Sequence, residues 1–207
     1  MKLGGHLPFS LIAPFYFLVE RPFQSCRKQA LDQTRATFEG QWIIVGAGTL
    51  PEYRLLNTGV EWQMIEPSKA MARKGKKRSQ KIGLQHSWHH TRWEDYDPSE
   101  EVEGIYFPFV LGVHPRPEEA LSKAWKTIRP GGTLLVVDLG LEKDAYQGLK
   151  WVNRLFTYLV SRPVWSLKAW MNQHGEAHFE PSSMGAGIWI CLKVAGERRS
   201  AYPKQKG

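Results

Sequence analysis

Cysteine is scarce in this sequence of 207 residues, which contains only Cys26 and Cys191, far apart in the chain. A single distant pair cannot form a disulfide scaffold, and neither cysteine has neighbours that would complete a zinc site. This cysteine usage is typical of a reducing compartment. Internal repeats are also missing, which argues against solenoids and propellers.

Long hydrophobic runs are missing as well. The nearest candidate is Leu7 to Val19, which is apolar apart from Ser10, but Pro8 and Pro14 interrupt it and no small-x-small cleavage site follows. A bilayer span needs roughly 20 apolar residues, so this run is too short. We interpret it as a segment that packs on the domain or lies at an interface, not as a signal peptide.

Positive charge and tryptophan are plentiful. The chain has 28 Lys and Arg against 20 Asp and Glu, a net charge of +8, together with nine tryptophans. The hydrophobic share of 42% is enough for one folded domain and too high for a disordered chain. Basic charge and aromatic rings together indicate an anionic partner, either a nucleic acid or a membrane interface.

Short apolar runs alternate with helical patterns along most of the chain, which predicts an α/β fold with a mainly parallel sheet. Residues 1–195 form the predicted domain, with an N-terminal segment over 1–39, an aromatic-rich helical region over 147–171 and a basic tail over 196–207. Helices are expected at 24–38, 51–56, 69–81 and 117–128, and the turn 129–132 should end the last of these. Strands are expected at 42–45, 60–65, 82–88, 103–108, 133–139, 177–181 and 187–194.

A glycine turn follows the first expected strand, and an acidic residue follows the second. The turn reads Gly46-Ala47-Gly48-Thr49, and Glu66 comes 18 residues after Gly48. Parallel sheets bind ligands at the carboxyl ends of their strands, where glycines allow close approach and an acidic residue can hold ribose hydroxyls. Pro51 occupies the place of the third glycine of a dinucleotide fingerprint, so a pyrophosphate ligand is disfavoured. The alternative is a plain tight turn with a surface glutamate.

Four segments in this order resemble class I S-adenosylmethionine-dependent methyltransferases. They are Val45 to Thr49, Ile65 to Met71, Phe109 to Leu121 and Ile128 to Asp138, the last with an Arg-Pro-Gly-Gly turn before a buried strand. The resemblance runs from about residue 14 to 194. Within the superfamily the chain looks like small bacterial phosphatidylethanolamine N-methyltransferases and quinone-ring methyltransferases.

The resemblance implies a Rossmann-like, doubly wound, mainly parallel seven-stranded sheet with an antiparallel last strand. It also implies S-adenosylmethionine as cofactor, with the glycine-turn backbone at the methionine end, Glu66 at the ribose, and residues 107–111 running under the cofactor where the acceptor enters. The helices of 147–171 would form a substrate lid. The cofactor-binding candidates are Gly46, Ala47, Gly48, Thr49, Glu66, Pro67, Trp93 and Phe109.

The sequence departs from the family pattern at three places. Ile44 stands where an acidic residue usually precedes the turn, and Leu50 replaces its third glycine. The Asp expected after the third strand is missing, and Glu94 and Asp95 are the first acidic residues there. Three outcomes stay open: weak cofactor binding, adenine stacking on Trp88 or Trp93, or a methyltransferase fold that has lost catalysis and serves as a binding or assembly protein.

Methyl transfer from a sulfonium is an in-line displacement, so the protein mainly has to align donor and acceptor. An amine acceptor is helped by a nearby base, for which His114 and Tyr16 are the candidates. In this family a tyrosine of the N-terminal segment often lies near cofactor and substrate. The trio His86, His89 and His90 could imitate a metal face, but it falls at a strand end and other ligands are missing, so we expect no metal.

The segment 69–81 carries seven basic residues and no acidic one. A solvated helix face, an anionic lipid contact and an RNA contact are all compatible with it. The aromatic helix around Trp151 and Arg154 is either packed core or an interfacial helix, and it favours lipid over nucleic acid. The candidate substrate or membrane surface is therefore Lys74, Lys76, Lys77, Arg78, Trp151 and Arg154.

These observations predict methyl transfer to a lipophilic acceptor, either a phospholipid amino head group or a quinone-like ring. We expect a cytoplasmic protein with a peripheral contact to the inner face of the membrane. A non-catalytic methyltransferase-fold protein is the second hypothesis. An RNA methyltransferase is the third, because the sequence shows no separate RNA-binding module.

Overall fold

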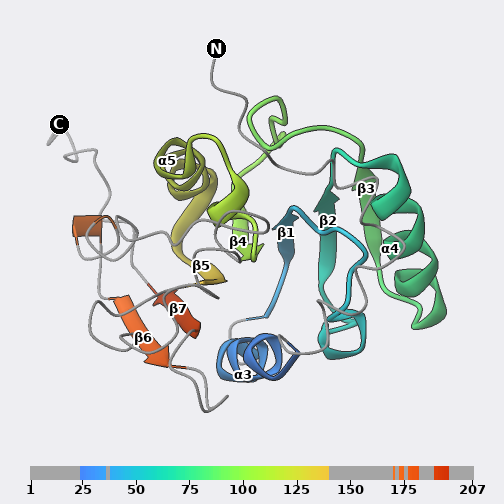
Figure 1. The fold of residues 1–207 in the computed structure, drawn as a ribbon, viewed down its shortest axis with the longest axis horizontal. Coiled ribbons are helices and arrows are strands. Elements are labelled where there is room, and N and C mark those ends of the chain that lie inside the picture. Colours follow the sequence, from blue (N-terminus) through green and yellow to red (C-terminus); the bar gives the residue numbers. More distant parts are fainter. Residues whose placement is uncertain are drawn as a thin grey trace, which may run out of the picture.

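The computed structural model describes residues 24–35, 38–139, 170, 173, 174, 177–181 and 189–195. Its centre is a sheet with the strand order β3-β2-β1-β4-β5-β7-β6 (Figure 1). Five strands run parallel: β1 (Gln41–Val45), β2 (Glu61–Ile65), β3 (His86–His89), β4 (Val102–Pro108) and β5 (Ile128–Leu139). The order reverses at β1, so the chain has the predicted doubly wound α/β class.

Two more strands extend the sheet beyond β5. The strand β7 (Trp189–Ala195) pairs antiparallel with β5, and β6 (Ala177–Pro181) pairs antiparallel with β7. Only their backbone course and pairing are described here.

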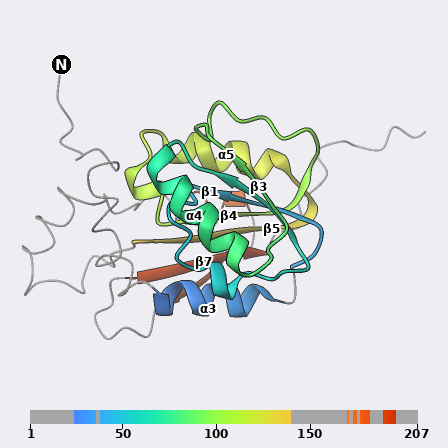
Figure 2. The same cartoon turned by 90° about the vertical axis from the view of Figure 1, so that its right-hand side faces the viewer.

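Helices cover both faces of the sheet. The helix α3 (Gln24–Thr34) lies on one face and α5 (Pro117–Thr127) on the other (Figure 2). The helix α4 (Lys69–Lys81) lies at the flank formed by β3 (Figure 1). Among the described helices, none combines the length and the hydropathy that a membrane-spanning segment needs.

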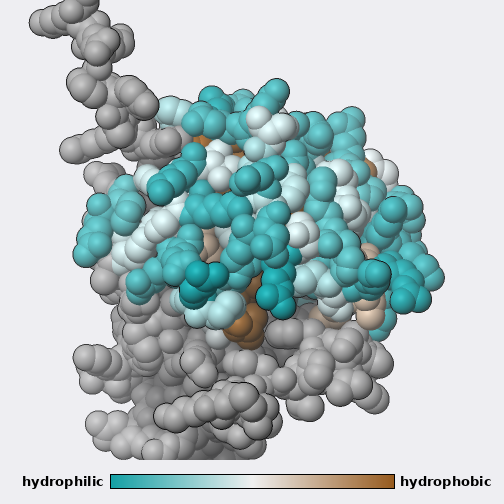
Figure 3. All heavy atoms as spheres, turned by 90° about the horizontal axis from the view of Figure 1, so that it is seen from above, coloured by the Kyte–Doolittle hydropathy of each residue, from teal (hydrophilic) through white to brown (hydrophobic). Residues whose placement is uncertain are grey.

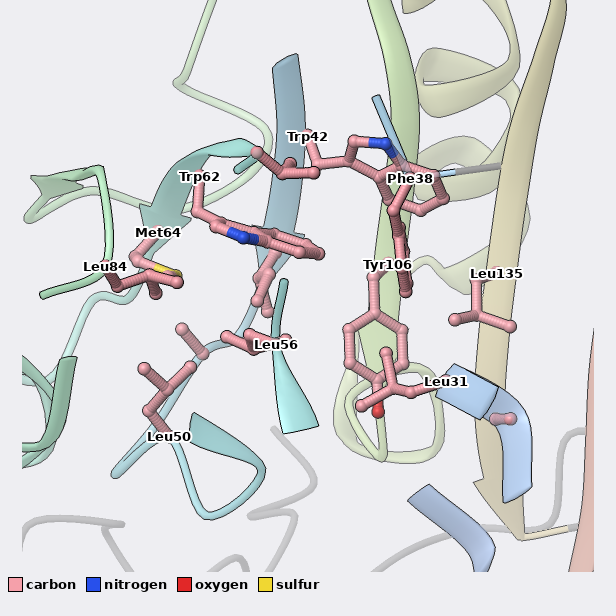
Figure 4. Packing of buried hydrophobic residues seen from close by; sticks show 14 of the residues in the cluster. Leu31, Phe38, Trp42, Leu50, Leu56, Trp62, Met64, Leu84, Tyr106 and Leu135 are labelled. Carbon is pink, nitrogen blue, oxygen red and sulfur yellow. The ribbon is translucent and has the colours of Figure 1, made fainter. Parts of the chain in front are cut away.

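Side chains along β1 alternate between two cores, because successive residues of a strand point to opposite faces. Trp42 and Ile44 pack with α3 and the turn after β1, whereas Ile43 and Val45 pack with α5. In the first core, the ring of Phe38 lies edge-on to Trp42 at 4.6 Å between centroids and to Trp62 at 5.5 Å (Figure 4). Residues of both cores are almost fully buried, so the sheet is a rigid platform for the loops at its carboxyl edge.

Several predicted boundaries were wrong. The expected helix at 51–56 is only a 3-10 turn, η3 (Tyr53–Leu55). The third strand begins at His86 instead of residue 82, because α4 continues to Lys81 and Gly83 then adopts a φ of 63°. The first helix ends at Thr34 rather than residue 38.

The turn at 129–132 belongs to β5 instead of separating it from α5. The helix ends at Thr127 and the extended backbone starts at once. Val102 pairs with Ile128 while Gly104 pairs with Thr133, so the segment between them forms an irregularity in the ladder. The prediction that the fourth strand ends at Pro108 was confirmed.

The N-terminal segment 1–23, the lid region apart from Trp170 and the basic tail 196–207 lie outside the described residues. The predictions made for them, including Tyr16, Trp151 and Arg154, therefore stay predictions. Seen from above, the described part of the surface is mainly hydrophilic, with only small hydrophobic patches (Figure 3).

Candidate functional site

A pocket of about 360 Å³ opens at the carboxyl ends of β1, β2 and β4. This is the edge at which an open parallel sheet binds its ligands. It combines apolar walls with a few polar groups, as ligand sites usually do. Its lining consists of Val45, Gly46, Gly48, Ile65, Glu66, Pro67, Met71, Arg92, Trp93, Glu94, Pro108, Phe109, Val110, Val113, His114 and Pro115.

The glycine turn folds back onto the end of β2. The backbone N–H groups of Gly46 and Ala47 both donate to the carbonyl of Ile65, at 2.8 and 3.1 Å. Gly46 has a φ of 69°, and a Cβ there would lie 2.6 Å from Cγ2 of Val110. Glycine is therefore required at this position both by the backbone conformation and by the close approach of the β4 loop.

Glu66 occupies the position that the sequence predicted, at the end of β2. Its Oε2 accepts from the Gly48 N–H at 2.8 Å, and its Oε1 accepts from the Ser68 N–H at 2.7 Å. Burial raises the pKa of this carboxyl, and the two backbone hydrogen bonds and the nearby His90 oppose that rise. Each carboxylate oxygen can accept more than one hydrogen bond, so both remain able to accept from ligand hydroxyls.

Two positions near the turn depart from the family pattern, and their structural environments differ. Leu50, at the place of the third glycine, has a φ of 54° and is fully buried. The turn thus keeps a glycine-like backbone although a leucine stands there. Ile44 is fully buried in the core, so no carboxylate lies beneath the turn at this position.

Two predicted cofactor residues do not line the pocket. Ala47 is buried in the core on the α3 side, and the Thr49 side chain faces α4. One Arg78 nitrogen, Nη1, donates to both the carbonyl oxygen and Oγ1 of Thr49, each at 3.0 Å. The prediction that Arg78 belongs to an exposed basic surface was wrong, because its guanidinium ties α4 to the glycine turn.

The loop after β4 forms the opposite wall. Phe109 has a φ of 56°, rare for a non-glycine residue, and its N–H donates to the Val137 carbonyl at 2.6 Å. The Arg27 guanidinium lies 4.6 Å from the centroid of the Phe109 ring. Nε of Arg27 is in turn 3.4 Å from a carboxylate oxygen of Glu52, in a pair that is almost fully buried.

The Arg27–Glu52 pair was not predicted, since it joins two residues of different elements that carry no shared motif. The pair lies where α3 meets the turn after β1. Because Arg27 contacts the Phe109 ring, the pair supports this wall of the pocket. Buried charges are costly unless they are paired, so this pair fixes how the two elements pack.

The two tryptophans proposed to stack on adenine have different positions. Trp93 lines the pocket but is 2% exposed, and its indole N–H donates to the Ala120 carbonyl at 3.0 Å. It therefore forms part of the wall instead of an open stacking surface. Trp88 is not among the lining residues, and its ring packs against Gly75 of α4.

Glu94 and His114 face each other across the pocket rim. Nε2 of His114 lies 3.2 Å from Oε1 of Glu94, and Nδ1 of His114 accepts from the Arg116 N–H at 3.1 Å. An accepting Nδ1 places the proton on Nε2, which lies close to Glu94 but makes no hydrogen bond within the described part of the chain. The predicted role of His114 as a base therefore stays a prediction.

Each member of the predicted histidine trio has a partner in the protein. His86 contacts Ser79 and the Leu84 carbonyl, His89 contacts Ser87, and His90 contacts the Glu66 carbonyl. Burial lowers the pKa of His89. Within the ranges that the structure describes, no group of three or more His, Cys, Asp or Glu side chains could hold a metal ion.

Comparison with known proteins gives matches in structure but not in sequence. No family model matches the sequence, and no curated protein does. A plantazolicin methyltransferase, BpumL, solved in complex with SAH (S-adenosylhomocysteine), superposes with a TM-score of 0.68 at 12% identity, over 90% of this chain and 89% of that one.

Two further solved structures also superpose on this chain. A SAM-dependent methyltransferase from Thermotoga maritima, described as a possible histamine N-methyltransferase, gives a TM-score of 0.61 at 19% identity, over 91% of this chain and 98% of that one. The chain has the fold of SAM-dependent methyltransferases. A possible exported protein from Bordetella parapertussis gives 0.64 at 14% identity over 80% of this chain, which spans 65% of that protein.

The structure brings seven of the predicted site residues together at the pocket. They are Gly46, Gly48, Glu66, Pro67, Trp93, Phe109 and His114. The sequence analysis assigned no role to Arg92, Glu94 and Val113, which lie in loops without regular periodicity. Lys74, Lys76 and Lys77 lie on the exposed side of α4, away from the pocket lining.

Proposed function

We propose that this chain binds S-adenosylmethionine in the pocket and transfers its methyl group to a lipophilic acceptor. The observation that carries the proposal is the joint position of Glu66 and the glycine turn at the pocket, with the carboxylate bonded to the Gly48 N–H at 2.8 Å. The methyltransferase fold and SAH in the BpumL structure support the same ligand.

The residues of the pocket fit the parts of such a cofactor. Glu66 would accept from the two ribose hydroxyls, and Pro67 and Met71 offer apolar contact to a base beside it. Gly48 lines the pocket, and a Cβ there would meet only the Gly46 carbonyl oxygen at 3.8 Å, so a ligand can approach this backbone closely. A volume of about 360 Å³ lies within the range of small-molecule sites.

Glu94 would take the role of the missing Asp after the third strand. Oε1 of Glu94 lies 3.2 Å from Nε2 of His114, and among the described residues Oε2 has no partner, so Oε2 can accept a hydrogen bond from the amino group of adenine. A site that hydrogen-bonds an N–H rejects an analogue that lacks it. S-inosylhomocysteine, with a carbonyl in place of that amino group, should therefore bind much more weakly than SAH.

Glu94→Gln tests this assignment by isothermal titration with both ligands. A carboxamide can donate to the inosine carbonyl, so the preference for SAH should shrink by roughly tenfold or more. Asp95→Asn, an exposed neighbour that does not line the pocket, serves as the control. An unchanged preference in Glu94→Gln would contradict the role of Glu94 while leaving cofactor binding intact.

The bound cofactor supplies a methyl group on a positively charged sulfur. The chain has to bind the cofactor and the acceptor, to orient them and to exclude water. Alignment of two reactants can lower the barrier by on the order of 7–11 kcal/mol. The β4 loop, with Pro108, Phe109 and Val110, forms an apolar wall for this purpose. Its position is fixed by the hydrogen bond from the Phe109 N–H to the Val137 carbonyl and by the Arg27 guanidinium over the Phe109 ring.

The proposed acceptor is a phospholipid amino head group or a quinone-like ring. The apolar character of the β4 wall supports a lipophilic molecule, and the described likeness of one structural neighbour to a histamine N-methyltransferase supports an amine. Tyr16 and His114 both stay candidate bases for an amine acceptor; Nδ1 of His114 is occupied by the Arg116 N–H, so Nε2 is the nitrogen that would act.

Isothermal titration with SAH tests the cofactor, and labelled S-adenosylmethionine incubated with lipid and quinone extracts tests the acceptor. We expect saturable SAH binding and transfer of label to an organic-soluble product. Absence of SAH binding at millimolar ligand would overturn the whole proposal. Binding with label transferred only to water-soluble molecules or RNA would overturn the acceptor class alone.

A second candidate function is binding or assembly without catalysis. The buried Ile44 favours it, because the turn lacks the acidic residue that usually precedes it in this family. This alternative predicts SAH binding with no transfer to any extract. The two experiments above therefore separate it from the enzyme.

A further inference from the structure

The exposed side of α4 carries a compact basic surface. A helix turns by 100° per residue, so its side chains sort into faces. Met71, Gly75 and Ser79 form the buried face, and Arg78 is bound to Thr49. The remaining basic residues are all exposed and define what we call the basic face: Lys69, Arg73, Lys74, Lys76, Lys77 and Lys81.

The basic face destabilises α4. Lys69, Arg73, Lys77 and Lys81 follow one another at a spacing of four, where like charges repel. The first turn contains no acidic residue, so Lys69 also opposes the helix dipole. Among the described residues, Lys69, Arg73, Lys76, Lys77 and Lys81 make no ion pair. An anionic partner would relieve this repulsion.

The N-terminal end of α4 borders the pocket. Glu66 and Pro67 precede α4 directly, and Met71 in its first turn lines the pocket. The helix forms the outer flank of the molecule beside the edge strand β3 (Figures 1 and 2). A partner bound along α4 therefore lies next to the entrance of the cofactor site.

We propose that the basic face of α4 docks on an anionic lipid surface. The face is about 20 Å long, and apart from Gln80 the exposed side chains of α4 are all basic. The residues of α4 include no aromatic ring on which a nucleic-acid base could stack, and Trp88, which packs against this helix, lies against Gly75. Stable membrane attachment takes a basic patch and an apolar signal, and the sequence supplies the second in residues 7–19.

The docking surface adds a partner to the proposed function without depending on cofactor binding. It places the pocket entrance beside a bilayer, where a lipophilic acceptor is concentrated. Each basic residue near an anionic membrane adds to the attraction, and salt weakens it. The surface therefore predicts binding that requires anionic lipid and falls with ionic strength.

Vesicle co-sedimentation tests this directly. The full chain is mixed with vesicles of phosphatidylcholine alone and with vesicles holding about 30% phosphatidylglycerol. We expect binding to the second kind only. The double variant Lys76→Glu/Lys77→Glu should lose on the order of tenfold or more in vesicle affinity.

The control is Arg35→Glu/Lys126→Glu, which makes the same change in net charge at two exposed positions, one directly after α3 and one on α5. It should keep most of the vesicle affinity, and both double variants should melt like the wild type and bind SAH equally well. Equal losses in the two variants, or no binding to anionic vesicles, would overturn the proposal. So would binding of duplex RNA, at physiological salt, more tightly than vesicles and through the same two lysines. None of these outcomes bears on SAH binding, so the two proposals fail independently.

Discussion

The backbone N–H of Gly48 donates to Oε2 of Glu66 at 2.8 Å, which joins the turn after β1 to the residue after β2. The second carboxylate oxygen of Glu66 receives the Ser68 N–H, so the same side chain also orders the start of α4. One carboxylate thus fixes three segments around the pocket before any ligand is bound. Pre-organisation of this kind lowers the ordering cost of binding.

Glu66→Gln should weaken SAH binding by roughly tenfold to a hundredfold, since hydrogen bonds to a charged acceptor contribute about 1.5–3 kcal/mol. The amide nitrogen of glutamine would also face one of the two backbone N–H donors. Isothermal titration measures the loss. Glu61→Gln, an exposed residue on the same strand, is the control, and equal effects of the two substitutions would contradict the assignment.

The raised pKa of Glu66 predicts a pH dependence. A carboxyl whose pKa is higher in the folded state contributes stability that is present below its ordinary pKa of 4.5 and lost as the pH rises through the folded value. The melting temperature of Glu66→Gln minus that of the wild type should therefore increase as the pH rises through this window. Calorimetry from pH 4 upward, at values on the order of one unit apart, measures the difference. A constant difference would contradict the raised pKa.

Much of this fold follows from local sequence pattern, and the site follows in part. Glu66 and the glycine turn were predictable because each ends a buried strand, and parallel strands bring their carboxyl ends to one edge. Arg78 was misplaced because a run of basic residues does not show which side chain turns inward. It lies seven residues after Met71, on the same face of the helix, and that spacing was the available signal.

The remaining pocket residues depend on packing that the sequence pattern does not encode. Arg27 and Glu52 meet only because α3 packs on one face of the sheet against the turn after β1, and Glu94 comes near His114 through irregular loops. The short β3 was predicted too early because Ile82 and Leu84 are apolar, as strand residues usually are. Those two side chains instead pack against the core from the turn that ends α4.

Arg78→Met should destabilise the protein and loosen the glycine turn. The substitution keeps an unbranched apolar stem but removes the guanidinium and with it both hydrogen bonds to Thr49, so a loss of about 1–3 kcal/mol in unfolding free energy is expected, with weaker SAH binding. Lys77→Met is the matched control, because it removes the adjacent but exposed charge. Urea unfolding and SAH titration of both variants measure the effects. Equal losses of stability and of SAH affinity in the two variants would show that the hydrogen bonds of Arg78 to Thr49 do not stabilise the turn.

Gly75→Ala tests the contact between α4 and the turn. A Cβ at this position would lie 2.3 Å from the outer edge of the Trp88 indole and 3.0 Å from the Gly48 carbonyl oxygen. Overpacking of this kind costs about 1–3 kcal/mol. Trp88→Phe removes the part of the ring that clashes, so the double variant should lose less than the sum of the two single losses. Strictly additive losses in urea unfolding would show that the indole does not set this spacing.

The buried pair behind Phe109 allows a double-mutant cycle. Arg27→Met removes the cation beside the buried Glu52 carboxylate, and Glu52→Gln removes the anion beside the buried Arg27 guanidinium, so each single variant should lose about 3–5 kcal/mol. The double variant should recover part of that loss, because neither charge is then stranded.

Arg27→Met also removes the cation from the Phe109 ring, so its SAH affinity should fall even where the protein is still folded, whereas Glu52→Gln should retain more of that affinity. Calorimetry and SAH titration of the three variants decide the matter. Additive losses would mean that the two residues do not stabilise each other, and equal SAH affinities would mean that the ring of Phe109 holds its place in the pocket wall without Arg27.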